Sequence, residues 1–183
     1  MCLFNFMIYN KGKGKDMSKV NAVVYTSNTG HTYEYAKMVA EYTGLPVYSL
    51  KEKNKLQKNS SVIYMGWLFA GTVKGYRKAI KSFNVPAVLG VGLCGTGELT
   101  EKVRISNLIP ENVALFTVQG GMNHGKLKGI NKLMINALMK SMSGKSDMSK
   151  EEAERLALLR QGGYFVSRDN LADFFKWYNT NNI

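Results

Sequence analysis

Five short apolar runs are spaced along the chain, and each is continuous rather than alternating between apolar and polar residues. Continuous runs of this length are typical of parallel strands that helices cover on both faces. Because helical patterns separate several of the runs, the sequence predicts an α/β fold with a doubly wound parallel sheet. The predicted strands are Val20–Tyr25, Leu45–Leu50, Ser61–Trp67, Val85–Leu93 and Val113–Val118.

Helical patterns are clearest in the first half of the chain and again after the fifth run. Thr32–Tyr42 repeats apolar side chains at helical spacing, and Gly44 follows as a C-terminal cap. Gly75–Phe83 predicts a second, shorter helix between the third and fourth strands. The last helix is predicted over Asp169–Tyr178.

A helical insertion is predicted at about residues 124–162, where the alternation of strands and helices stops. Lys126–Met142 combines apolar side chains at helical spacing with four lysines, which is typical of a basic amphipathic helix. Such a helix can contact a membrane, receive a partner or pack on its own domain, and all three interpretations stay open. A capping-box pattern at Ser149 and Glu152 opens a further helix.

Charge narrows the choice of partners more than composition does. The chain has 183 residues, of which 45% are hydrophobic and 21% charged, as in an ordinary single globular domain. No apolar run approaches the roughly 18 residues of a membrane span. The formal net charge of +12 favours anionic partners such as phosphate-bearing cofactors, acidic proteins or anionic lipids. Since the lysines are scattered and no recognition motif is present, we expect no nucleic-acid partner.

The first sixteen residues differ from the rest, because a short apolar segment is followed by alternating Lys and Gly. They lack the layout of a secretory signal, so residues 1–16 are predicted to be a non-native or a disordered extension, and residues 17–183 a single domain. The two cysteines, Cys2 and Cys94, offer no disulfide framework and no zinc-site spacing. We therefore expect no metal and a cytoplasmic location.

The first predicted strand runs directly into TSNTGHT, Thr26–Thr32, just before a predicted helix. Hydroxyls and N–H groups ahead of a helix N-terminus attract anions, and Thr32 could serve as both cap and ligand. A nucleoside-triphosphatase loop would need Lys after Gly30, where His31 stands, and a dinucleotide fingerprint would need three spaced glycines. The segment therefore predicts a monophosphate site without metal or lysine, and an ordinary hydroxyl-rich helix cap is the alternative.

This strand–loop–helix pattern resembles the FMN-phosphate loop of flavodoxins, and the match consists of Thr26, Ser27, Asn28, Thr29, Gly30, His31 and Thr32. The resemblance implies FMN as cofactor and a flavodoxin-like five-stranded parallel sheet in the order 2-1-3-4-5, with helices on both faces. It also implies variation at the position of His31, which we expect to face solvent.

The same resemblance implies two further segments that hold the flavin ring. After the third strand, the candidate contacts are Gly66, Trp67, Leu68, Phe69, Ala70 and Gly71. After the fourth strand, they are Cys94, Gly95, Thr96 and Gly97. Trp67 could stack on the ring or pack in the core, and both interpretations stay open. Cys94 fits a small buried hydrophobe better than a redox-active thiol.

The second half carries a further resemblance. Phe116–Asp147 is similar to the segment after the fifth strand in menaquinone-dependent protoporphyrinogen dehydrogenases, with the L-M-I-x-x-L-M-K-x-x-S-G-like core at Leu133–Gly144. Together with the other matching segments it covers about residues 20–178. The chain departs from those enzymes at residues 67–69, where they carry a charged and tyrosine-rich stretch, so the substrate stays open.

The resemblances imply a cytoplasmic FMN-binding protein of electron transfer or oxidoreduction, linked to a quinone, a porphyrinogen or an acidic redox protein. A peripheral contact with the inner face of a membrane through Lys126–Met142 stays an alternative. With only His31 and His124 in the chain, we find no catalytic triad, and His124 is more simply a polar turn residue than a substrate contact. The rival interpretation is a flavodoxin-like module without turnover, acting as an electron carrier or as a binding domain for an acidic partner.

Overall fold

The central sheet contains five parallel strands in the order β2-β1-β3-β5-β6, which is the order 2-1-3-4-5 along the chain. The structure, a computed structural model, describes residues 19–181, so the predicted extension at 1–16 lies outside it. The predicted fold class is confirmed. The strands are β1 (Ala22–Thr26), β2 (Val47–Ser49), β3 (Ser61–Phe69), β5 (Asn84–Gly92) and β6 (Ala114–Gln119).

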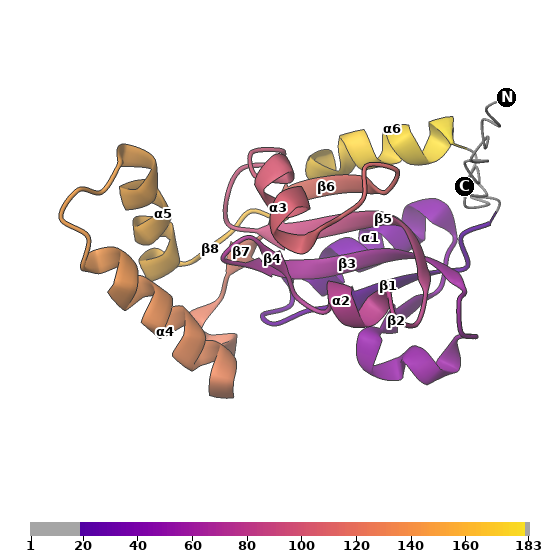
Figure 1. The fold of residues 1–183 in the computed structure, drawn as a ribbon, viewed down its shortest axis with the longest axis horizontal. Coiled ribbons are helices and arrows are strands. Elements are labelled where there is room, and N and C mark those ends of the chain that lie inside the picture. The colour runs from indigo at the N-terminus through magenta and orange to yellow at the C-terminus, as the bar shows by residue number, and fades with distance from the viewer. Residues whose placement is uncertain (1–18, 182–183) are drawn as a thin grey trace, which may run out of the picture.

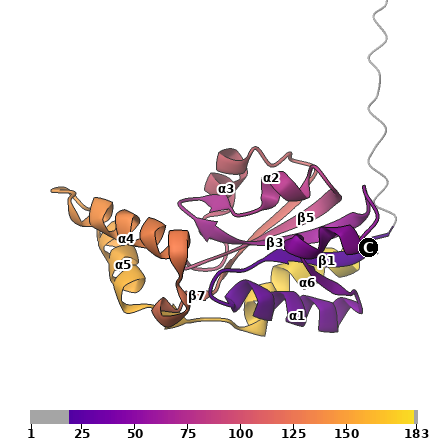
Figure 2. The ribbon, with the colours of Figure 1, turned by 90° about the horizontal axis from the view of Figure 1, so that it is seen from below.

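Helices cover both faces of the sheet, and Figure 2 shows the three layers edge-on. Alternate residues of β1 point to opposite faces: Val24 packs in the cluster that includes Tyr76, whereas Val23 packs with Tyr35 and Phe174. One face therefore carries α1 (His31–Thr43) and α6 (Ala172–Thr180), and the other α2 (Tyr76–Ala79) and α3 (Thr100–Asn107).

Three helical elements differ from the prediction. The second helix extends only over Tyr76–Ala79, because the chain turns at Ser82 and Phe83 to enter β5. The helix α3 was not predicted, since its eight residues bury only Val103 and Asn107 and so lack a clear apolar period. The 3-10 helix η1 (Leu50–Lys55) is also additional, and it follows β2.

The chain between β6 and α6 forms an arm beside the sheet, which we call the inserted hairpin (residues 121–164; Figure 1). Its helices are α4 and α5, and its base is a pair of short antiparallel strands. The capping box of Ser149 and Glu152 is present at the start of α5, as predicted. The elements are β7 (Gly121–Met122), η2 (His124–Lys126), α4 (Gly129–Ser143), α5 (Lys150–Gln161) and β8 (Gly163–Tyr164); η3 (Arg168–Leu171) then leads into α6.

The helix α4 divides its apolar side chains between two sides. Ile135 is buried and Leu138 faces a cavity described below, whereas Ile130 and Leu133 are 69% and 64% exposed. The predicted helix is present but begins at Gly129, since Lys126 belongs to η2, and its contact with a membrane or a partner stays a prediction. Among the described residues, no helix is both long enough and apolar enough to cross a membrane.

Candidate functional site

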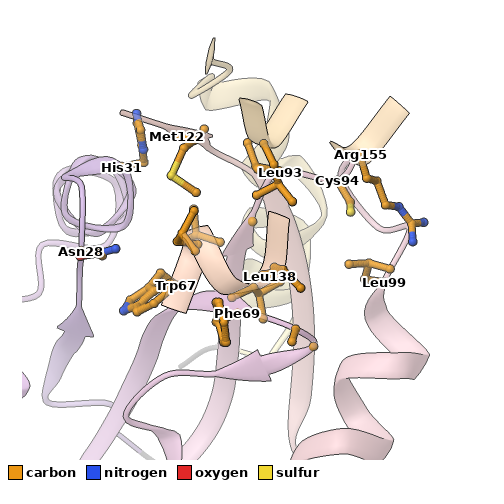
Figure 3. Close-up of a pocket in the computed structure, with 18 of the residues that line it drawn as sticks. Asn28, His31, Trp67, Phe69, Leu93, Cys94, Leu99, Met122, Leu138 and Arg155 are labelled. Carbon is orange, nitrogen blue, oxygen red and sulfur yellow. The ribbon is translucent and has the colours of Figure 1, made fainter. Parts of the chain in front are cut away.

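A cavity of about 330 Å³ lies between the carboxyl ends of the central strands and the inserted hairpin. Figure 3 shows Asn28 and His31 at one end, Cys94 and Arg155 at the other, and Leu138 of α4 between them. Its volume falls in the lower part of the range for small-molecule sites. Loops of the sheet form one wall and both helices of the inserted hairpin form the opposite wall.

The segment TSNTGHT leaves the first turn of α1 open. The helix begins at His31, and its first internal amide bond runs from Glu34 N to Gly30 O at 3.0 Å. The earlier amides of the turn have no partner within the helix. Gly30 is the N-cap residue, with φ of 112°, and no side chain caps the turn, so the predicted capping role of Thr32 is wrong.

Buried hydroxyls lie directly beside this open turn. Thr32 lines the cavity and is only 2% exposed, yet its side chain makes no hydrogen bond within residues 19–181. Thr29 Oγ1 lies 3.1 Å from His31 Nδ1, and Ser27 Oγ accepts a bond from Gly30 N at 3.2 Å. Among the described residues the one buried side-chain nitrogen or oxygen without a partner is Asn84 Oδ1, so the Thr32 oxygen keeps access to the cavity. This hydroxyl and the amides of the open turn can therefore bond to a polar ligand here.

His31 is buried, with 6% of its surface exposed, which contradicts the predicted solvent-facing position. It is the first residue of α1 rather than a loop residue, and its ring lies 5.6 Å from the ring of Tyr164. Burial lowers the pKa of His31; the nearby Glu34 carboxylate opposes this shift, and the Lys126 ammonium adds to it. The neutral imidazole is therefore the favoured form.

Thr26, the first residue of TSNTGHT, makes its side-chain hydrogen bond away from the cavity. The Tyr64 hydroxyl lies 2.9 Å from Thr26 Oγ1 and 2.7 Å from the carbonyl oxygen of Lys74. Burial raises the pKa of Tyr64 to about 12, so the phenol keeps its proton. These contacts fix the end of β1 against its neighbour β3.

The predicted ring loop after the third strand is a β-hairpin. The strand β3 continues to Phe69 and returns through Ala70 and Gly71 into β4 (Thr72–Val73). The two turn residues have φ of 47° and 80°, as two-residue hairpin turns require. Gly66 is buried outside the cavity lining, and a Cβ there would lie 2.6 Å from Val73 Cγ1, so this glycine serves packing.

Trp67 and Phe69 project from the same side of this hairpin. Their ring centroids are 6.0 Å apart, and Lys74 Nζ lies 5.6 Å from each ring. Both residues are half-buried and line the cavity together with Leu68, Ala70 and Gly71. An aromatic wall on the cavity favours contact with a flat ligand over a role in the core, and stacking on flavin stays a prediction.

Only Cys94 of the predicted fourth-strand loop lines the cavity. Gly95, Thr96 and Gly97 lie outside the lining, because the turn is bonded to β6 and Thr96 Oγ1 accepts from Gln119 N at 3.1 Å. Cys94 is half-buried, and burial raises the pKa of its thiol. A protonated, half-buried thiol fits the hydrophobic interpretation of this residue.

An open groove, which we call the basic groove, lies on the other side of TSNTGHT. Thr26 and Gly30 line this groove instead of the cavity, whereas Ser27, Asn28 and Trp67 line both. In the part of the chain that the structure describes, no Asp or Glu contributes to its lining. Its cations are Lys51, Lys53, Lys74, Arg77, Lys78 and Lys81.

The inserted hairpin adds contacts that sequence reasoning missed. Asn131 Nδ2 donates to Asn28 Oδ1 at 2.9 Å, and the Tyr164 hydroxyl donates to Glu34 Oε2 at 2.7 Å. These partners are 103 and 130 residues apart along the chain, so no local pattern predicts them. The only sequence signal for these contacts was the resemblance of the segment after the fifth strand.

His124 is exposed in a short turn outside the cavity lining, as its simpler interpretation predicted.

Among residues 19–181, no group of three or more His, Cys, Asp or Glu side chains is arranged to hold a metal ion. Comparisons of the chain with protein-family models, with curated proteins and with solved structures found no match. The case for a flavodoxin-like site therefore depends on TSNTGHT, on the strand order and on the cavity between them.

Proposed function

We propose that the protein binds FMN at TSNTGHT and transfers electrons through it. The observation that carries the proposal is the open first turn of α1, with its unpartnered Thr32 hydroxyl, directly beside a cavity with an aromatic wall. A phosphate group suits the open turn, and a flat apolar ring suits the wall of Trp67 and Phe69.

Each part of the site has a distinct role in this proposal. Thr29, Thr32 and the free amides of α1 would hold the phosphate, and Ser27 orders the loop through Gly30. FMN, when bound, supplies the electron-transfer chemistry. The inserted hairpin excludes water from one side of the cavity, and the protonated thiol of Cys94 packs there without reacting.

The far end of the cavity favours an oxidoreductase linked to a quinone or a porphyrinogen. Leu138 of α4, between the two ends, and Leu159 of α5 give this part of the cavity an apolar roof. Lys102 and Arg155 also line it, and neither has an ion pair within residues 19–181. A flat apolar molecule would fit under the roof, and the carboxylates of a porphyrinogen would be attracted to the two cations.

The test is to purify the protein, record its visible spectrum and titrate it with FMN. We expect oxidised-flavin absorbance in the bound state. Thr29→Ala with Thr32→Ala should weaken FMN binding at least about tenfold, because hydrogen bonds to a charged group contribute about 1.5–3 kcal/mol each. Thr180→Ala, at an exposed position of α6, is the control and should bind as the unaltered protein does. A protein that stays colourless and ignores added FMN would refute the proposal.

The same preparation separates an enzyme from a carrier. The reduced, FMN-loaded protein is mixed with a soluble menaquinone analogue, and the return of flavin absorbance is followed in time. Rapid, saturable reoxidation is expected for a quinone-linked enzyme. Slow reoxidation that is linear in the analogue concentration would instead favour a carrier.

The basic groove supports a second candidate, an electron carrier that docks on an acidic protein. Six cations line this groove, and its shared residues Ser27, Asn28 and Trp67 bring it close to the proposed flavin site. Complementary charge steers such encounters and raises association rates. An acidic donor bound there would approach the flavin from the groove side of TSNTGHT, where Asn131 of the inserted hairpin also contributes to the lining.

A further inference from the structure

The proposed phosphate site lacks a cation of its own. Thr26–Thr32 contains no Lys or Arg, and the only acidic residue in the first turn of α1 is Glu34. A phosphate monoester carries a charge of about −1.5 to −2 at neutral pH. Backbone amides and hydroxyls offset part of this charge, and a nearby carboxylate opposes its binding.

The inserted hairpin places an ammonium group beside Gly30, the N-cap residue of this turn. A Cβ built on Gly30 would lie 3.7 Å from Lys126 Nζ and 3.6 Å from Glu34 Oε1. Lys126 ends the 3-10 helix η2, and its backbone N donates to Asn123 Oδ1 at 3.2 Å. Its main chain is thus held by a local cap while its side chain reaches across to TSNTGHT.

The Lys126 ammonium remains available for a further partner. Within residues 19–181, it makes no ion pair and no side-chain hydrogen bond. The Glu34 carboxylate, which also lies beside Gly30, accepts from the Tyr164 hydroxyl. Lys126 also adds to the lowering of the pKa of His31, so its charge acts on the open turn of α1.

We infer that Lys126 of the inserted hairpin supplies the positive charge that holds the cofactor phosphate at TSNTGHT. The inference rests on the proposed FMN binding, and its own observation is the ammonium of Lys126 beside Gly30, which has no ion pair within residues 19–181. Phosphate binding then ties the inserted hairpin to the sheet, in addition to the bond between Asn131 and Asn28.

The test compares FMN with riboflavin, which has the same ring and lacks the phosphate. In the full chain, Lys126→Gln should raise the dissociation constant for FMN by about fivefold or more, the effect of one charge pair at 4 Å in a water-like dielectric. Riboflavin affinity should not change. The loss for FMN should shrink as KCl is added, since salt screens an exposed charge.

Two controls keep this result specific. Lys132→Gln, at an exposed position of α4, removes the same charge and should leave the FMN affinity unchanged. Lys126→Arg keeps the charge and should bind FMN as the unaltered protein does. An unchanged FMN affinity in Lys126→Gln would overturn the inference while leaving the proposed function intact, as would an equal loss for both flavins. If the unaltered protein binds neither flavin, the proposed function and the inference fail together.

Discussion

A buried neutral histidine at the start of α1 makes the stability of the fold depend on pH. Burial lowers the pKa of His31 in the folded state, whereas the unfolded chain takes up the proton near the ordinary value of about 6.5. The stabilisation is therefore complete above that value and is lost as the pH falls toward the folded pKa. We expect urea midpoints to decline between pH 7.5 and pH 5.5, and His31→Gln to make that decline shallower.

The control for this experiment is the other histidine. His124→Gln, in an exposed turn, should keep the slope of the unaltered protein. If His31→Gln leaves the slope of urea midpoint against pH unchanged, His31 is not buried as the neutral imidazole.

The same residue shows what could be predicted at this scale. The hydroxyls of TSNTGHT and Gly30 are adjacent in sequence, so their gathering at the end of β1 was predictable. The burial of His31 was not, because its neighbours include Tyr164, whose ring centroid lies 5.6 Å from that of His31 and which is more than a hundred residues away along the chain.

At the scale of elements, the outer side of α4 is the surface that could meet a membrane. Ile130 and Leu133 are largely exposed there, and no Asp or Glu lies on this helix. We expect the protein to co-sediment with vesicles that contain anionic lipid and not with neutral vesicles. Ile130→Ser with Leu133→Ser should weaken that binding at least about tenfold, since even partial burial of the two side chains is worth more than about 1.4 kcal/mol when full burial of each contributes about 1.5–3 kcal/mol.

The helix α3 offers a matched control for this experiment. Ile105→Ser with Leu108→Ser removes apolar side chains that are 72% and 79% exposed, and vesicle binding should be unaffected. Equal losses in both double variants would show that α4 has no special role at the lipid surface.

Helices and strands with many apolar residues were the ones that the sequence predicted. The strands of the central sheet are continuous apolar runs, so all five were predicted. The helix α3 was not predicted, because it buries few side chains. The β3–β4 hairpin was not predicted either, because its turn depends on positive φ angles at Ala70 and Gly71, which an apolar pattern does not reveal. That hairpin matters for the site, since it presents Trp67 and Phe69 to the cavity.

At the scale of the whole molecule, the net charge of +12 should steer anionic redox partners toward the basic groove. We expect the FMN-loaded, reduced protein to be oxidised by ferricyanide at a rate that falls as ionic strength rises. Lys78→Glu with Lys81→Glu should slow the reaction several-fold at low salt and leave it unchanged at high salt, as measured by stopped flow.

A control with the same change of net charge separates the effect of the groove from the effect of the total charge. Lys140→Glu with Lys176→Glu alters residues on α4 and α6, outside the groove lining. Comparable slowing by both double variants would mean that total charge, and not the groove, controls the approach of the oxidant.

The bond between Asn28 and Asn131 also has a consequence for biosynthesis. Domains fold from the N-terminus during synthesis, at about 5–20 residues per second. The segment TSNTGHT is among the first parts to emerge, but the residues that enclose the cavity extend to Leu159. A ribosome-bound chain that stops before α5 would present TSNTGHT without its cover, so we expect the proposed FMN to be fully retained only after α5 has been synthesised.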